Sequence, residues 1–215
     1  MAGLVLLVLV YSLIAQRNAP QMTTRQKILK TVYPAFMRIT NWFNTNRGVF
    51  LNPGKTPLAD FYQLRAKDIS GGLVDFSGFR GKKVLLVNTA SDCGYTAQYD
   101  ELEQLWKNYG QHLTVIAFPA NDFKEQEKGN AAEIAAFCRK NYGVSFPLME
   151  KAVVLPGPAQ HPVYQWLTRA GLNGWNDRPP SWNFAKYLVD ERGHLQAYFG
   201  PSVSPLSTDI TSLLK

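Results

Sequence analysis

The continuous apolar run Val84-Leu85-Leu86-Val87 constrains the fold of this chain more than any other feature. Hydrophobic residues without polar alternation are typical of a strand that is buried on both faces, as in the centre of a parallel sheet. Cys93 follows in the next loop, and a helical pattern opens directly behind it. We therefore expect a thiol between a central strand and the N-terminus of a helix.

A cysteine at that place is a candidate for reactive chemistry. Free N–H groups and the helix macrodipole favour the thiolate, which is the nucleophilic form, over the thiol. The chain has 2 cysteines, Cys93 and Cys138, which cannot form a disulfide scaffold but do suit redox chemistry. The alternative for a single cysteine after a strand is an inert buried thiol.

Strand and helix signals alternate along the chain from about residue 58. Strand patterns cover 61–67, 73–76, 83–88, 113–118, 184–189 and 195–199, and helical patterns cover 97–109, 131–141, 163–169 and 207–214. Turn residues at 71–72 and 190–193 predict two hairpins. This order of elements around a reactive cysteine predicts a thioredoxin-like α/β fold, in which a central mixed sheet is flanked by helices.

Residues 1–22 are interpreted as a hydrophobic anchor or signal-like segment. The stretch 2–15 is apolar and uncharged, but as a helix it spans only about 21 Å, against roughly 30 Å for a hydrocarbon core. It lacks the basic start of a cleaved signal peptide. A short membrane anchor, an atypical signal peptide and a truncated longer one all stay open, and we expect membrane association through this segment.

The side of the membrane also stays open. A signal would direct the chain to the periplasm or out of the cell. Basic residues on the C-terminal side of the segment, from Arg17 to Lys30, would instead keep the main domain in the cytoplasm by the positive-inside rule.

Residues 23–57 are interpreted as an amphipathic helix and a linker. Apolar residues recur at helical spacing over 24–44, at Ile28, Leu29, Val32, Tyr33, Phe36, Ile39, Trp42 and Phe43. Pro34 is expected to kink this helix or to move its start. The helix is basic, and it either lies on an anionic membrane surface or packs on the main domain. Turn formers over 45–57 predict a linker that leads into a domain over 58–215.

The net charge of +7 does not indicate nucleic-acid binding. That function needs Lys and Arg gathered on one element beside aromatic residues. Here the basic residues are dispersed, apart from a modest excess over 17–38, so a soluble basic surface is the simpler interpretation.

Three segments of the main domain carry polar residues in a distinctive arrangement. They are Asn88-Thr89-Ala90-Ser91-Asp92-Cys93-Gly94-Tyr95-Thr96, then Phe118-Pro119-Ala120-Asn121-Asp122-Phe123 followed by Gln126-Glu127, and Ser181-Trp182-Asn183-Phe184-Ala185-Lys186-Tyr187-Leu188-Val189. In this order they resemble the three motifs of the glutathione peroxidase family, and the resemblance extends from about Phe61 to the C-terminus. The combination carries the resemblance, since any one segment alone is weak evidence.

The resemblance implies a cysteine-dependent peroxidase on a thioredoxin fold over 58–215. Such an enzyme reduces hydrogen peroxide and organic or lipid hydroperoxides to water and alcohols with a thiol reductant, in the response to oxidative stress. Matched motif by motif, its catalytic residues are Cys93, Gln126, Trp182 and Asn183. The Cys93 thiolate would attack the peroxide and become a sulfenic acid. The other three side chains would donate hydrogen bonds to the thiolate and to the leaving oxygen.

No cofactor and no metal site is expected. The three histidines, His112, His161 and His194, lie outside all three motifs. A single histidine such as His161 cannot make a metal site without a cluster of further ligands.

Two departures from the family pattern bear on the reductant. Ala120 stands where many members carry a cysteine. Cys138 lies in the helix that holds the resolving cysteine of thioredoxin-using members, but one residue early, which turns the side chain by about 100°. Cys138 is therefore either a resolving cysteine or a core residue on the apolar face of that helix.

The short segment between Trp166 and Trp182 resembles the shorter form of the family. That form is usually monomeric, and thioredoxin-type reductants are common in it. We expect a monomer, and both a thioredoxin-type protein and glutathione stay open as the reductant.

Two other functions stay open. A thiol-disulfide oxidoreductase of the same fold is disfavoured, because Thr96 stands where a Cys-x-x-Cys motif has its second cysteine. A membrane-tethered binding or redox-sensing protein would use Cys93 only to pass on oxidation.

Overall fold

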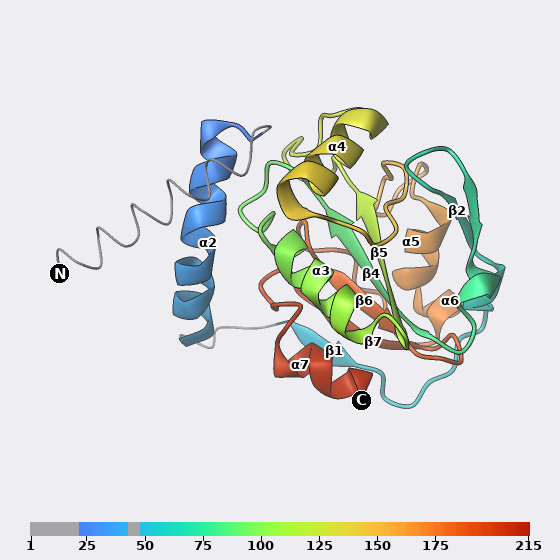
Figure 1. Cartoon of the computed structure of the whole chain (residues 1–215). Helices are drawn as coiled ribbons and strands as arrows, with labels where there is room; N and C mark the ends of the chain where they lie inside the picture. The colour runs from blue at the N-terminus through green and yellow to red at the C-terminus, as the bar shows by residue number, and fades with distance from the viewer. Residues whose placement is uncertain (1–21, 43–47) are drawn as a thin grey trace.

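The computed structural model describes residues 22–42 and 48–215. The predicted hydrophobic segment 1–22 therefore lies almost wholly outside the described residues. Within these residues a five-stranded mixed sheet forms the centre of the molecule (Figure 1).

The order of the strands in the sheet is β1-β7-β6-β4-β5. Strand β4 (Lys83–Thr89) is buried along its whole length, and it pairs in parallel with β5 (Leu113–Pro119). On its other side β4 pairs antiparallel with β6 (Lys186–Val189), which continues through a hairpin into β7 (Leu195–Phe199). The predicted central strand and mixed sheet are confirmed.

Helices cover both faces of this sheet. One buried cluster joins Leu85 and Val87 of β4 to residues of α3 (Gln98–Tyr109), α4 (Ala131–Tyr142) and α7 (Thr208–Thr211). A second cluster joins Val84 and Leu86 to residues of α5 (Pro162–Leu167). Because successive side chains of a strand point to opposite faces, the apolar run of β4 supplies both layers of the core at once.

Two short elements complete the second layer. Strands β2 (Arg65–Lys67) and β3 (Leu73–Asp75) form the predicted hairpin, although its first residues, Phe61–Gln63, are a 3₁₀ turn instead of a strand. Asp60 favours that turn, because its side chain accepts a hydrogen bond from the Tyr62 N–H at 2.9 Å. Helix α6 (Ala170–Asn173) was not predicted.

A strand lies inside the segment that we predicted to be a linker. Strand β1 (Val49–Leu51) pairs antiparallel with β7 and becomes an edge of the central sheet. The prediction of a linker over 45–57 is therefore wrong for these residues, because backbone pairing with β7 offers them hydrogen bonds that a free connection lacks.

The amphipathic helix is confirmed as α2 (Thr24–Trp42), and it lies alongside the main domain (Figure 1). Pro34 does not move its start. Tyr33 and Met37 are buried against Ala97, while Ile28 and Val32 remain 55% and 48% exposed. Among the helices of the described residues, none is long and apolar enough to span a membrane.

Candidate active site

The loop after β4 holds Cys93 in a fixed turn. The Thr96 hydroxyl accepts the Cys93 N–H at 3.0 Å and lies 2.9 Å and 2.7 Å from the carbonyl oxygens of Ala90 and Cys93, to which it donates. One side chain thus ties the loop together from inside. This role of Thr96 was not predicted, although threonine hydroxyls commonly bond to backbone groups nearby in the chain.

The sulfur of Cys93 lies in the turn that leads into α3 and not on the helix itself, which begins at Gln98. The N–H of Tyr95 approaches the sulfur at 3.4 Å. As expected, the thiol lies between β4 and the N-terminus of a helix. The N–H that reaches the sulfur, however, belongs to the turn before α3 and not to the helix.

Burial dominates the ionisation of Cys93. The residue has no exposed surface, and this desolvation raises the pKa of its thiol above the usual value. Hydrogen bonds from the Tyr95 N–H and from the side chains of Trp182 and Asn183 lower the pKa, and the negative charge of Asp92 raises it. The expectation that the helix end would favour the thiolate is wrong in its net sign, because the loss of hydration outweighs the donors.

Asn88, at the end of β4, positions the third motif. Its side-chain amide donates to the backbone carbonyl of Trp182 at 3.1 Å, and the backbone carbonyl of Asn88 accepts a hydrogen bond from the Phe184 N–H at 2.6 Å. Phe184 adopts a left-handed φ of 68°, which is unusual for an aromatic residue. The Trp182 ring packs at 5.4 Å from the ring of Phe123 in the second motif.

Gln126 joins the same group through two contacts. Its side-chain oxygen accepts a hydrogen bond from the Asn183 amide at 3.0 Å, and its backbone carbonyl accepts the Asp92 N–H at 3.1 Å. The two residues before it, Lys124 and Glu125, both have left-handed φ values, of 50° and 52°. Backbone strain is thus concentrated in the loops that surround the thiol, as it often is at functional sites.

The structure therefore brings the four predicted catalytic residues together from three segments. Trp182 and Asn183 reach Cys93 directly, and Gln126 is held by Asn183 and by the backbone of Asp92. Two of the three predicted donors, Trp182 and Asn183, thus reach the thiol, whereas the side chain of Gln126 accepts a hydrogen bond from Asn183. Such an arrangement can stabilise a thiolate and the oxygen anion that leaves when a peroxide is cleaved.

A buried carboxylic acid lies next to this group. Glu127 is 1% exposed, and its carboxyl oxygen lies 3.1 Å from the Ser91 hydroxyl. Burial raises the pKa of Glu127 to about 7, although hydrogen bonds from Ser91 oppose the shift. Sequence reasoning assigned no role to this residue, and nothing in the periodicity of the loop marks it as buried.

Cys138 lies in α4, fully buried on the core side of the helix. Burial raises the pKa of its thiol to about 12, and a hydrogen bond with Tyr99 only partly offsets this. Both cysteines are free thiols in this structure. The environment of Cys138 is that of a core residue.

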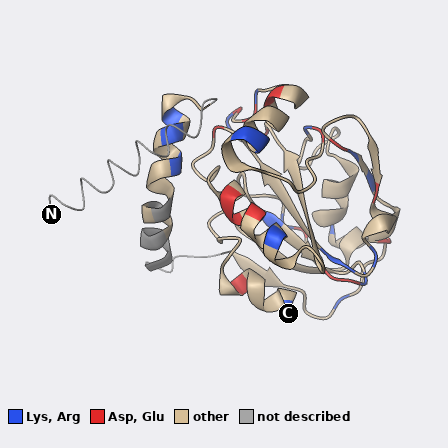
Figure 2. Ribbon diagram, viewed as in Figure 1, with Lys and Arg blue, Asp and Glu red and all other residues tan. Residues whose placement is uncertain are grey.

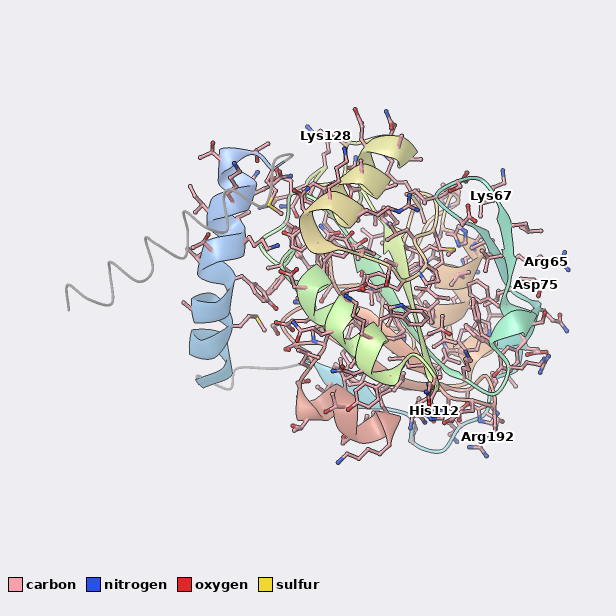
Figure 3. All side chains as sticks on the ribbon, viewed as in Figure 1. Arg65, Lys67, Asp75, His112, Lys128 and Arg192 are labelled. Atoms are coloured by element: carbon pink, nitrogen blue, oxygen red, sulfur yellow. The ribbon has the colours of Figure 1, made fainter. Side chains whose placement is uncertain are left out.

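A groove of about 1140 Å³ runs beside the active-site loops. Its walls are the first turn of α2, the loop that carries Gln126, and the exposed side of α4. Lys128, which lines this groove, is labelled in Figure 3. In the described part of the chain, no three His, Cys, Asp or Glu side chains are grouped so as to bind a metal ion.

Comparisons with known sequences agree with the three motifs. The family profile described as Glutathione peroxidase matches residues 61–168. The chain is 43% identical over 156 residues to the glutathione peroxidase homolog BsaA of Halalkalibacterium halodurans, covering 71% of this chain and 98% of that protein. It is 41% identical over 163 residues to the hydroperoxy fatty acid reductase gpx1 of Synechocystis, covering 71% and 95%.

Solved structures agree with the fold. The crystal structure of Trgpx in apo form has a TM-score of 0.55 at 33% identity, covering 73% of this chain and 96% of that one. A thiol:disulfide interchange protein from Chlorobium tepidum has a TM-score of 0.53 at only 17% identity, covering 76% and 99%, and this likeness shows the thioredoxin-like fold alone. Together with the three motifs and their meeting at Cys93, these matches show that the chain belongs to the glutathione peroxidase family.

Proposed function

We propose that Cys93 is the nucleophile of a cysteine-dependent peroxidase, on the strength of the donors that converge on its sulfur. The thiolate attacks the terminal oxygen of a hydroperoxide, the O–O bond breaks, and the departing alkoxide takes a proton and leaves as an alcohol. With hydrogen peroxide the leaving group is water. Cys93 is oxidised to a sulfenic acid in this step.

The neighbours of Cys93 have separate tasks in this proposal. Trp182 and Asn183 hold the thiolate by hydrogen bonds, as does the N–H of Tyr95. Gln126 keeps the Asn183 amide in place, because it accepts one of the two hydrogens of that amide. Because none of these groups titrates near neutral pH, they act in this proposal as hydrogen-bond donors and not as bases.

An external thiol completes the cycle. It attacks the sulfenic sulfur, water leaves, and a mixed disulfide forms; a second thiol then releases the Cys93 thiol and leaves with the first as a disulfide. We favour a thioredoxin-type protein, which supplies both thiols, with glutathione as the alternative. Cys138 is not the resolving thiol in this proposal, because it lies fully buried on the core side of α4, where burial also raises the pKa of its thiol.

Stopped-flow mixing of the reduced protein with hydrogen peroxide and with a fatty acid hydroperoxide tests the first step. We expect oxidation of Cys93 far faster than that of a free thiol, and none in Cys93→Ser. Cys138→Ser is the matched control, since it removes the other buried thiol. Oxidation of Cys93 at the rate of a free thiol would refute the peroxidase proposal. The remaining interpretations would then be a redox-sensing protein and a thiol-disulfide oxidoreductase.

Parallel turnover assays with thioredoxin and its reductase, and with glutathione and its reductase, test the second step. We expect turnover with thioredoxin that survives Cys138→Ser. Loss of that turnover would make Cys138 the resolving cysteine, and turnover with glutathione alone would reverse the choice of reductant.

We also propose that the N-terminal extension associates the enzyme with membranes, where lipid hydroperoxides form. Ile28 and Val32 lie one turn apart on the face of α2 that the domain leaves exposed, and Lys27 directly precedes Ile28. The basic positions in the N-terminal half of α2 are blue in Figure 2. Apolar and basic side chains together suit an anionic membrane surface. We expect the full chain to sediment with anionic vesicles, and we expect sedimentation to weaken in an Ile28→Ser, Val32→Ser variant. Equal sedimentation of the two proteins would refute a role for this face.

We also propose that the protein is a monomer. Analytical ultracentrifugation without lipid tests this proposal.

A further inference from the structure

Helix α2 touches the loop that carries the nucleophile. The Arg25 guanidinium lies 2.6 Å from the Asp92 carboxylate, and the Gln26 side chain donates to the Ser91 carbonyl at 3.0 Å. Ser91 and Asp92 directly precede Cys93. The family match begins only at residue 61, so these contacts come from a part of the chain outside it.

The remainder of α2 is docked firmly enough to make these contacts persistent. Lys30 pairs with Asp100 at 3.2 Å at the start of α3, and its ammonium lies 4.0 Å from the ring centre of Tyr142 in α4. Tyr33 and Met37 are buried one and two turns further along. Figure 2 shows the basic part of α2 facing the acidic start of α3. Ionic and apolar contacts together hold α2 against α3 and α4.

Few charged groups face Cys93 in this arrangement. The loop of Cys93 itself carries Asp92 and the phenol of Tyr95. In the second motif, Lys124 lies above the Trp182 ring and Glu127 lies against Ser91. Helix α2 adds Arg25. Of these, the adjacent Asp92 carboxylate opposes ionisation of the thiol. The group that Asp92 pairs with is Arg25.

We propose that α2 is part of the active site, and that Arg25 is a positioning residue that neutralises Asp92 and holds the loop of Cys93. The unpaired carboxylate would repel both the thiolate and the anion that leaves during catalysis. Arg25 offsets part of that repulsion without touching the sulfur. The inference deepens the proposed function, since it rests on Cys93 as the reacting thiol.

Alkylation of Cys93 by iodoacetamide, measured against pH, tests this directly. Mass spectrometry of the Cys93 peptide in the full chain separates its rate from that of Cys138. By Coulomb's law, one unit charge roughly 7 Å from a titrating group in a water-like dielectric shifts its midpoint by about 0.4 pH unit. In Arg25→Gln we therefore expect the midpoint to rise by about that amount, and the rate well below the midpoint to fall about 2.5-fold.

Three further variants separate charge from structure. Arg25→Lys keeps the charge and is expected to restore the wild-type midpoint. Asp92→Asn alone is expected to lower the midpoint, because it removes the carboxylate that opposes ionisation of the thiol. Arg65→Gln is the matched control, because Arg65 pairs with Asp75 at 3.0 Å with the same 63% side-chain exposure, on the side of the domain away from α2 (Figure 3).

The inference is wrong if Arg25→Gln leaves the midpoint unchanged. It is equally wrong if Arg25→Lys fails to restore the midpoint, since a change that the restored charge does not reverse would reflect loosening of the loop. It is also wrong if 1 M NaCl, which screens exposed charges, leaves the change in midpoint intact. The alkylation profile does not depend on peroxide turnover. Failure of the inference can therefore be told apart from failure of the peroxidase proposal, which the stopped-flow rate decides.

Discussion

The buried Glu127 makes a quantitative prediction about stability. Its carboxyl group has a pKa of about 7 in the folded protein, against 4.5 for an unhindered glutamate, mainly because burial removes its hydration. Below pH 4.5 the carboxyl group is protonated in both the folded and the unfolded chain, and its burial carries no ionisation cost. As the pH rises towards 7, the unfolded chain ionises first. Folding then loses about 1.4 kcal/mol for each pH unit that separates the two pKa values, or about 3 kcal/mol in total.

The substitution Glu127→Gln removes this cost, because an amide has the same shape and cannot ionise. We expect the variant to be about 3 kcal/mol more stable than the wild type at pH 8 and equally stable at pH 4.5. With an m-value of about 4 kcal/mol per molar guanidinium chloride, the unfolding midpoint at pH 8 rises by about 0.8 M. Unfolding is followed by tryptophan fluorescence at both pH values.

Glu125→Gln is the control for this measurement. Glu125 is two residues away, 72% exposed, and paired with Lys128 on the surface. Its substitution is expected to change stability by less than about 0.5 kcal/mol at either pH. The reasoning is refuted if Glu127→Gln has the same effect at pH 4.5 and pH 8, because a constant difference reflects packing of the amide and not ionisation.

Three other predictions follow from the described contacts. Trp182→Phe keeps the ring but loses the indole N–H that reaches Cys93, so oxidation measured by stopped flow is expected to slow about tenfold at pH 7; an unchanged rate would remove Trp182 from the mechanism. Gly174→Ala would place a Cβ 2.3 Å from the Thr56 carbonyl at a φ of 98°, and calorimetry is expected to show a loss of about 2–4 kcal/mol, whereas an unchanged melting temperature would contradict the close approach. Lys186 is fully buried, and desolvation lowers its pKa to about 7. The free energy of unfolding of the wild type is therefore expected to rise relative to that of Lys186→Met between pH 7 and 9.5, by up to about 1.4 kcal/mol per pH unit. Parallel plots of the two free energies against pH would refute the lowered pKa.

Much of the fold could be predicted from the sequence, because long apolar runs and helical periodicity report burial directly. Strand β4 and the helices α3 and α4 follow from patterns that extend over many residues. The capped ends of α4 agree with its sequence as well, since Asn130 forms a capping box and Gly143 takes the left-handed position after the last turn. Elements of this kind are specified locally.

Short or exposed elements could not be predicted in this way. Strand β1 is three residues long and half-exposed, so its pairing with β7 depends on a partner almost 150 residues later in the chain. Helix α6 is a single turn held by Asn173, whose side chain donates to two backbone carbonyls. Neither leaves a periodic signal, because long-range contacts stabilise both.

The predictions about the candidate site also differ in how far the sequence could carry them. Cys93, Gln126, Trp182 and Asn183 were predicted from motifs; Trp182 and Asn183 lie within hydrogen-bonding reach of the sulfur, and Gln126 contacts Asn183. The direction in which the Cys93 pKa moves could not be predicted, because burial depends on how three distant segments pack together. The contact between Arg25 and Asp92 was equally hidden, since only the folded chain brings α2 beside the loop.

Strand β1 has a practical consequence for shortening the protein. The matched family segment starts at residue 61, which suggests a minimal enzyme without the N-terminal extension. Such a chain would lose the pairing of Val49–Leu51 with β7 and the stacking of Arg178 over the Phe50 ring at 3.8 Å. The backbone groups of β7 would then form an open edge, and open edges pair with other molecules and promote aggregation. A truncated form should therefore retain the chain from residue 48 onward, because β7 is covered by a strand that the family match leaves out.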